Sequence, residues 1–239
     1  MFGITYETWS AVCQMYFGMK TGTKNAYLQW FPFSKISKVD QCCILGKDFF
    51  SKYIESGAFV MFSAAMHRTE NFMQKSDGSF RDSSLVSSIL YLVLQSIGKE
   101  ISQKYTLQRP DDIKVYYAGN YECLRPLYKQ DYDAFFKSIN SDIEQYQYFI
   151  KTDITNFFST INLDKLIHQI DMVCNSDSAQ ISQNHLRLYK ELLAYCGDGR
   201  FPLIENSIAS SYMASVIYLD MIDCRIHKYI SESVTAFTD

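Results

Sequence analysis

The sequence predicts an α+β fold, and three observations carry that prediction. Apolar residues recur at helical spacing over most of the chain. A hairpin pattern centred on Asp77-Gly78 interrupts the helices of the first half, and two short segments further on have the alternation of strands. The resulting order is helices, hairpin, helix, strand, helix, strand and helices. It differs from the regular strand-helix series of a parallel sheet.

The composition is that of an ordinary globular protein of one or two domains. The chain has 239 residues, of which 47% are hydrophobic and 21% charged. The chain contains only 10 Gly and 4 Pro, which excludes collagen-like and low-complexity classes. Residues 1–120 carry 13 Lys and Arg against 10 Asp and Glu, whereas residues 121–239 carry 10 against 16. This asymmetry fits phosphate contacts in the first half and metal ligands in the second, or ordinary scatter.

The seven cysteines and the N-terminus indicate a location. The cysteines are dispersed, with no Cys-x-x-Cys pair, which is typical of reduced, intracellular proteins. The first residues, MFGITYETWS, lack the basic and apolar regions of a signal peptide. The longest apolar runs, such as 89–94, are too short to span a bilayer. We therefore expect a soluble, cytoplasmic protein without membrane contact.

In the first half, the pattern predicts helices around one hairpin. Residues 1–70 read as largely helical, with breaks near Gly22, Pro32 and Gly46. Residues 72–82 read as a hairpin, because both positions of an Asp-Gly turn tolerate positive φ. A helix follows, with Ser83 or Ser84 as its cap. Its apolar stripe consists of Leu85, Ile89, Leu92, Val93 and Ile97.

In the second half, two strands and four helices are expected. The strands are 113–117 and 148–154, and the latter has Asp153 near its end. A helix over 131–146 is expected to turn its apolar residues inward, namely Tyr132, Phe135, Phe136, Ile139 and Ile143. Further helices are expected over 163–173 and 185–196, the second stopped by Gly197. Pro202 precedes a long helix from about 207 to 230.

The sharpest chemical signal is KTDITNFFSTI, residues 151–161. It places Asp153 at the end of a strand, just before a Phe-Phe turn. A rigidly held carboxylate at the edge of a cleft suits Mg²⁺, which prefers hard oxygen ligands and orients phosphates. The alternative is an Asp that only caps a turn or a helix.

Two further features admit a functional and a structural interpretation. On the helix after Pro202, small residues share one face with Tyr218, which lets a flat ligand or another backbone approach closely. Tight packing in the core explains the same face. The hairpin carries Lys75 and Arg81, which are suited to phosphate but are also common on solvated surfaces.

Taken in order, these pieces resemble a family. The basic hairpin, a Tyr-rich block, DITNFF and a helix ending in YLDMID resemble the fingers and palm of a bacterial reverse transcriptase. The block YYAGNYECLRPLYKQDYDAFFKSI followed by FIKTDITNFFSTI is most similar to abortive-infection and other defence-associated reverse transcriptases. The resemblance extends from about residue 72 to residue 223.

The resemblance implies roles for individual residues. Asp153 matches the first metal-binding aspartate of the palm, and the backbone carbonyl of Ile154 would be a second ligand for two Mg²⁺ ions. Phe158 matches the aromatic gate under the incoming sugar, which favours deoxynucleotides. Arg81 matches the fingers arginine that grips the triphosphate, and Lys75 the neighbouring cation.

The helix after Pro202 matches the one that supports the template and the nascent base pair, with Ser207, Ser211 and Ser215 along it. The family has Pro-Gln-Gly at the start of this segment, whereas this chain reads Pro202-Leu-Ile-Glu-Asn-Ser without the Gly. Asn206 is then the expected polar contact to the nucleotide.

The remaining carboxylates of the family lie on an aromatic-x-Asp-Asp hairpin after the YLDMID helix. Phe237-Thr238-Asp239 either begins that hairpin, which makes Asp239 a metal ligand, or lies in the loop before it. The chain reads as the N-terminal part of a longer polymerase and is expected to be inactive alone. The segments would be an N-terminal helical region of the fingers (1–71), the fingers (72–147) and a partial palm (148–239), with the thumb absent.

The leading hypothesis is an RNA-directed or template-independent DNA polymerase in antiphage defence, with dNTPs and RNA or DNA as partners and oligomerisation possible. The second is an inactive polymerase-like scaffold that binds nucleic acid or protein. The third is an unrelated α+β domain. No Gly-rich phosphate loop, Gly-x-Ser-x-Gly or His-Glu-x-x-His supports another chemistry.

Overall fold

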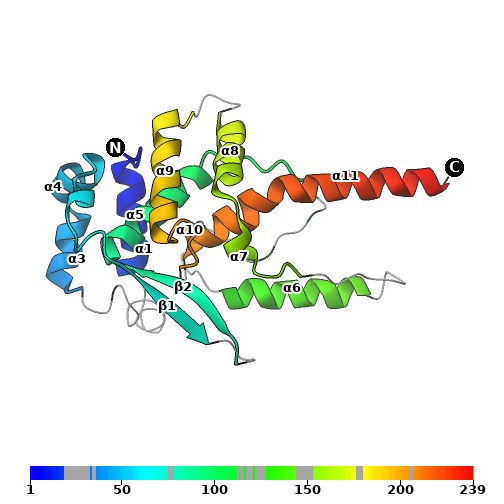
Figure 1. The fold of residues 1–239 in the computed structure, drawn as a ribbon, viewed down its shortest axis with the longest axis horizontal. Coiled ribbons are helices and arrows are strands. Elements are labelled where there is room, and N and C mark those ends of the chain that lie inside the picture. Colours follow the sequence, from blue (N-terminus) through cyan, green and yellow to red (C-terminus); the bar gives the residue numbers. More distant parts are fainter. Residues whose placement is uncertain are drawn as a thin grey trace.

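The computed structural model describes residues 1–18, 33, 36–74, 78–111, 113, 116, 121, 128–143, 153–175, 180–204 and 207–238. Helices dominate these residues, and a two-stranded antiparallel hairpin is the sheet among them (Figure 1). A helix-rich molecule with a small antiparallel sheet agrees with the predicted α+β class. No described helix combines the length and apolar character that a bilayer span requires.

The N-terminal region is helical where it is described, as the sequence predicts. The elements are α1 (Tyr6–Phe17), α3 (Lys38–Leu45), α4 (Lys47–Phe49), a π-helical turn η1 (Phe50–Glu55) and a 3-10 turn η2 (Ala58–Met61). Gly46 separates α3 from α4, so the predicted break at this residue is confirmed. Gly22 and Pro32 lie outside the described residues.

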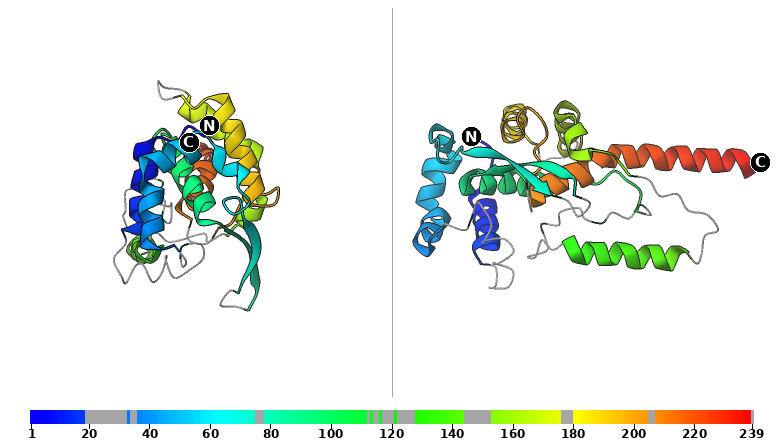
Figure 2. Two further views of the ribbon diagram at one scale, coloured as in Figure 1. Left: turned by 90° about the vertical axis from the view of Figure 1, so that its left-hand side faces the viewer. Right: turned by 60° about the horizontal axis from the view of Figure 1, so that its bottom comes forward.

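The hairpin is confirmed and is longer than predicted. β1 (Arg68–Gln74) pairs with β2 (Phe80–Val86), and Phe72 lies opposite Asp82. Gly78 has φ +82°, a left-handed conformation that glycine adopts without steric cost. Figures 1 and 2 show the outer ends of β1 and β2 projecting beyond the packed helices.

The extra length of β2 moves the start of the next helix, α5 (Ser88–Ser102). Ser83 and Ser84, the predicted caps, lie within β2, where Ser84 N–H donates to the carbonyl of Leu203 at 2.8 Å. The cap is Ser87, whose Oγ accepts from the backbone N–H of Leu90 at 3.1 Å. The predicted cap was therefore wrong, because β2 stays paired with β1 as far as Val86.

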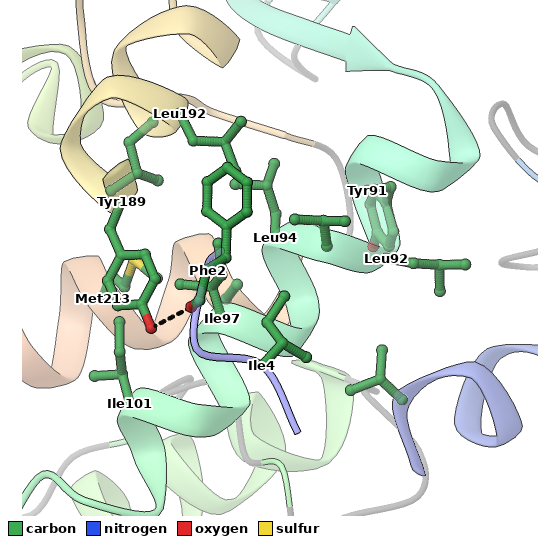
Figure 3. Close-up of a cluster of buried hydrophobic side chains, with 14 of the residues drawn as sticks. Phe2, Ile4, Tyr91, Leu92, Leu94, Ile97, Ile101, Tyr189, Leu192 and Met213 are labelled. Carbon is green, nitrogen blue, oxygen red and sulfur yellow. Dashed lines mark hydrogen bonds between the residues drawn. The ribbon is translucent and has the colours of Figure 1, made fainter. Parts of the chain in front are cut away.

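Helix α5 lies at the centre of the core. It packs between α1 and the α10–η3 segment, and its Leu92 and Ile97 are fully buried. The first residues of the chain cross this core: Phe2 is buried, and its carbonyl accepts from Tyr189 Oη at 2.9 Å (Figure 3). Thr5, the cap of α1, donates through its N–H and hydroxyl to the buried carboxylate of Glu100.

The C-terminal half also follows the predicted helices closely. Its elements are α7 (Phe157–Thr160), α8 (Leu163–Cys174), α9 (Gln183–Cys196), α10 (Ile208–Ser211), the π-helical segment η3 (Tyr212–Tyr218) and α11 (Leu219–Thr238). Gly197 ends α9 as predicted. The last three run on from one another as a long helix from Ser207, longer than predicted and with an unpredicted π-helical centre.

Helix α6 (Tyr128–Ile143) differs from the prediction in its burial. Phe135 and Phe136 are 37% and 43% exposed rather than inward. The Phe135 ring lies 5.6 Å from the rings of Phe136 and Tyr116, and no other described element packs extensively against α6. The side chains of Tyr132 and Ile143 lie outside the description.

Both predicted strands fall largely outside the described residues. The described parts are Ile113, Tyr116, Asp153 and Ile154, and they have irregular backbone.

The three segments predicted for the chain, 1–71, 72–147 and 148–239, contribute described residues to one shared hydrophobic core. The segment boundaries themselves stay a prediction.

Candidate functional site

The turn that follows Asp153 is fixed by local interactions. Asp153 and Ile154 are exposed, and Asn156 adopts φ 54° and ψ 36°, a left-handed conformation that Asn tolerates better than most residues. The Ser159 hydroxyl then donates to the Asn156 carbonyl, and the Thr160 hydroxyl to the Phe157 carbonyl, both at 2.8 Å. The carboxylate of Asp153 thus lies in solvent just ahead of an ordered turn.

The two phenylalanines of this turn attach it to the rest of the molecule. The ring of Phe157 lies 6.5 Å from that of Tyr218, at the end of η3. The ring of Phe158 lies 6.2 Å from that of the buried Phe201. The Tyr218 hydroxyl accepts from the N–H of Asn162 at 3.3 Å. Phe158, the expected aromatic gate, is half-buried in this arrangement.

The hairpin is anchored at its base. Arg68 at the start of β1 forms an ion pair with Asp198, and its guanidinium lies 5.9 Å from the centre of the Tyr195 ring. On the other strand, Ser84 forms a parallel bridge with Ile204. Both strands are therefore held, at the base of the hairpin, against the end of α9 and the segment that follows it.

The outer part of the hairpin is exposed. Arg81, the expected phosphate ligand, lies opposite Met73 in the strand register and faces solvent. Phe72 and Phe80, each 64% exposed, lie on the opposite face of the two-stranded sheet from Arg81. The cation is thus presented on one face and two aromatic rings on the other.

Residues 201–204 bring three of the predicted features together. Phe201 contacts Phe158 of the turn, the Leu203 carbonyl accepts from the N–H of Ser84 in β2, and Ile204 is the bridge partner of Ser84. Three residues beyond Ile204, Ser207 starts α10. The hairpin, the turn after Asp153 and the helix with the small residues therefore meet at one segment, although they lie far apart in sequence.

The serines along this helix differ in exposure. Ser207 is buried: its hydroxyl caps α10 and accepts from the side-chain amide of Gln95 at 2.8 Å. α5 and α10 approach so closely here that a Cβ on Gly98 would lie 2.6 Å from the Cβ of Ala209. Ser211 and Ser215 are half-buried. Tight packing therefore explains the start of the small-residue face, and only its continuation is accessible.

Three expected site residues lie outside the described residues. These are Lys75, Asn206 and Asp239.

The sequence analysis did not predict a buried polar cluster at the far end of this helix. Asp220 is completely buried, and its carboxylate accepts from Tyr105 Oη at 2.7 Å, from the N–H of Gln108 at 3.0 Å, and from the N–H and Nε of Arg109 at 2.9 and 3.1 Å. Nη1 of Arg109 lies 2.9 Å from a carboxylate oxygen of Asp223. We call these five residues the Arg109 cluster.

The Arg109 cluster changes the acidity of its members. Burial raises the pKa of Tyr105, so its hydroxyl stays a donor to Asp220. Partial burial also raises the pKa of Asp223, an effect that the neighbouring Asp220 reinforces and Arg109 opposes. The only sequence signal was an aspartate on the apolar stripe of a helix, four residues after the buried Val216.

The metal ions implied by the resemblance need more ligands than Asp153 supplies. Oxygen donors such as Asp153 and the Ile154 carbonyl suit Mg²⁺. Among the described residues, no three acidic, histidine or cysteine side chains gather as a metal site. The fit to two ions is therefore partial.

Neither the protein-family models nor the curated proteins compared with the chain gave a match.

Proposed function

We propose that the chain forms the fingers and part of the palm of a DNA-polymerising nucleotidyltransferase. The supporting observation is the junction at residues 201–204, which joins the cationic hairpin, the turn after Asp153 and the small-residue helix. A polymerase needs these parts next to one another, because the triphosphate, the metal ions and the base pair occupy one site.

In this proposal, Arg81 and Lys75 contact the triphosphate and Phe158 lies beneath the sugar. Asp153 and the carbonyl of Ile154 would hold Mg²⁺, with Asp239 as a further candidate ligand. The ions would stabilise the charge that develops on the phosphoryl group in transfer. A 3′-hydroxyl or a protein hydroxyl attacks the α-phosphate of the dNTP, and pyrophosphate leaves.

The proposed biological setting is antiphage defence in the cytoplasm. Synthesis is either RNA-directed or template-independent, with RNA or DNA as partners. Both modes share the same phosphoryl chemistry, and a primer-extension assay with and without added template separates them.

The deciding experiment is Asp153→Ala in the full-length gene product. We expect incorporation of labelled dNTPs in the presence of Mg²⁺ to fall at least a hundredfold, with an unchanged melting temperature because Asp153 is exposed. Asp133→Ala is the matched control, since Asp133 is an exposed acid on α6. Activity that survives Asp153→Ala would reject the proposal.

A scaffold that binds nucleic acid or protein is the second candidate. The exposed Phe72 and Phe80 on the projecting hairpin favour it, because exposed aromatic rings stack on bases or dock against a partner. This candidate predicts binding of single-stranded nucleic acid that Phe72→Ala weakens, without any Mg²⁺-dependent incorporation.

A further inference from the structure

The π-helical segment η3 interrupts the long helix at the height of Ser211 and Ser215. A π-helical turn contains one residue more than an α-helical one, and such segments are rare and frequently occur at functional sites. At the end of η3, Nη2 of Arg109 donates to the carbonyl of Val216 at 2.6 Å and lies 3.5 Å from the carbonyl of Ser215. The guanidinium thus serves as the partner of backbone carbonyls from the irregular part of the helix.

Arg109 cannot easily leave this position, because its other donors are also engaged. Its N–H and Nε bind Asp220, and Nη1 binds Asp223, one turn further along α11. Asp220 is in turn fixed by Tyr105, whose hydroxyl also accepts from Gln169 of α8. The side chain of Arg109 is 3% exposed, so water does not compete for its hydrogen bonds.

A network of this kind is better suited to fixing a register than to adding stability. Burying a guanidinium and a carboxylate costs about as much free energy as their attraction returns, and selection of one register is the best-attested role of buried polar groups. Here the carbonyls of η3 and the carboxylates of α11 bind different nitrogens of one rigid, planar group. A rotation of η3 relative to α11 would therefore break at least one of these bonds.

We propose that Arg109 is a positioning residue that holds η3 in its π-helical register and so sets the direction in which Ser215 faces relative to Ser211. A return of this segment to α-helical hydrogen bonding would rotate the two serines relative to each other by roughly 100° or less. This inference rests on the proposed function in one respect: the face with Ser211 and Ser215 would then support the template and the base pair that the incoming dNTP forms.

The test uses three variants of the full-length protein. Arg109→Met leaves Asp220 buried without its partner and is expected to be unstable. The double variant Arg109→Met, Asp220→Asn removes the charges of these two residues and keeps a side-chain acceptor for Tyr105. We therefore expect it to recover most of the melting temperature that Arg109→Met alone loses. Arg109→Lys keeps the charge without the planar fork.

The first readout is independent of activity. Ser211→Cys and Ser215→Cys are labelled with iodoacetamide in each background, with Ser51→Cys, on the exposed surface of η1, as the reference. Peptide mass spectrometry separates these sites from the exposed Cys42 and Cys43. We expect the ratio of labelling at the two sites to change at least threefold in the double variant. An unchanged ratio would overturn the inference.

The second readout is nucleotide incorporation. In the double variant we expect the KM for dNTP to rise at least tenfold although the melting temperature has recovered, and Arg109→Lys to be intermediate. A KM that returns to the wild-type value together with the melting temperature would mean that Arg109 only stabilises the fold. If the wild type incorporates no nucleotide, the proposed function fails, and the labelling ratio alone decides on the register.

Discussion

The two ends of the helix from Ser207 to Asp220 are held by different chemistry. At the start, the uncharged side chain of Gln95 donates to Ser207 and accepts from the N–H of Ala209 at 3.0 Å. At the far end, within the Arg109 cluster, the charged side chain of Arg109 and its backbone N–H bind the carboxylate of Asp220. Both anchors are buried and both connect segments that lie about a hundred residues apart in the chain.

The difference follows from what each anchor has to satisfy. The helix begins in regular α-helical form, where the amide of Gln95 supplies an acceptor for an N–H of the first turn and donates to the capping hydroxyl of Ser207. Within η3, the carbonyls of Ser215 and Val216 face Nη2 of Arg109, and a guanidinium with five donors can bind them together with the carboxylates of α11. The charged anchor therefore occurs where the backbone is irregular.

The largest expected effect comes from breaking the charged anchor. Asp220→Ala leaves the guanidinium of Arg109 buried without its main partner, and we expect the free energy of unfolding to fall by about 3–5 kcal/mol. Urea unfolding of the protein measures it. Asp164→Ala is the control, because its ion pair with Lys190 is exposed and is expected to contribute less than about 1 kcal/mol. Equal losses in the two variants would contradict the expected difference between a buried and an exposed ion pair.

A smaller effect is expected at the neutral anchor. Gln95→Met keeps the volume of the side chain but removes the acceptor of the Ala209 N–H and one donor to Ser207. We expect a loss of about 1–3 kcal/mol, the cost of one unsatisfied buried polar group. Gln108→Met changes an exposed side chain and should stay within about 0.5 kcal/mol of the wild type. If Gln95→Met costs more than Asp220→Ala, the order of the two anchors is wrong.

The smallest effect concerns pH and Asp223. Partial burial raises the pKa of this carboxyl above its ordinary value of 3.8, so the folded protein binds the proton more tightly than the unfolded chain. The resulting stabilisation is complete below pH 3.8 and disappears as the pH rises through the folded pKa. Urea midpoints from pH 3 to 6 should therefore show the advantage of the wild type over Asp223→Asn shrinking with increasing pH. An advantage that grows with pH would mean that the attraction of Arg109 outweighs burial.

Much of the fold could be predicted because its signals are local. The Asp-Gly turn gave the hairpin, and helical periodicity with an end signal gave α8, α9 and the long helix. The errors arose where the local pattern does not say what an element pairs with or packs against. Ser84 is not a cap because its strand stays paired with β1 as far as Val86, and Phe135 faces solvent because little packs on α6.

The candidate site was less predictable for the same reason. The motif around Asp153 could be recognised, and its Asn156 fits the left-handed turn that the structure shows. The contact of Phe158 with Phe201 and the bonds between Arg109 and Asp220 join residues far apart in sequence, and no local pattern encodes them. A single charged residue in an apolar helical stripe was their only trace.

The placement of Phe2 has a consequence for how the protein is made. Its carbonyl bonds to Tyr189, which is synthesised 187 residues later. At about 5–20 residues per second on the ribosome, this partner follows roughly 10–40 s after Phe2. The first residues of the chain are therefore among the last to reach their final position, and α5 keeps part of its apolar surface uncovered throughout that interval.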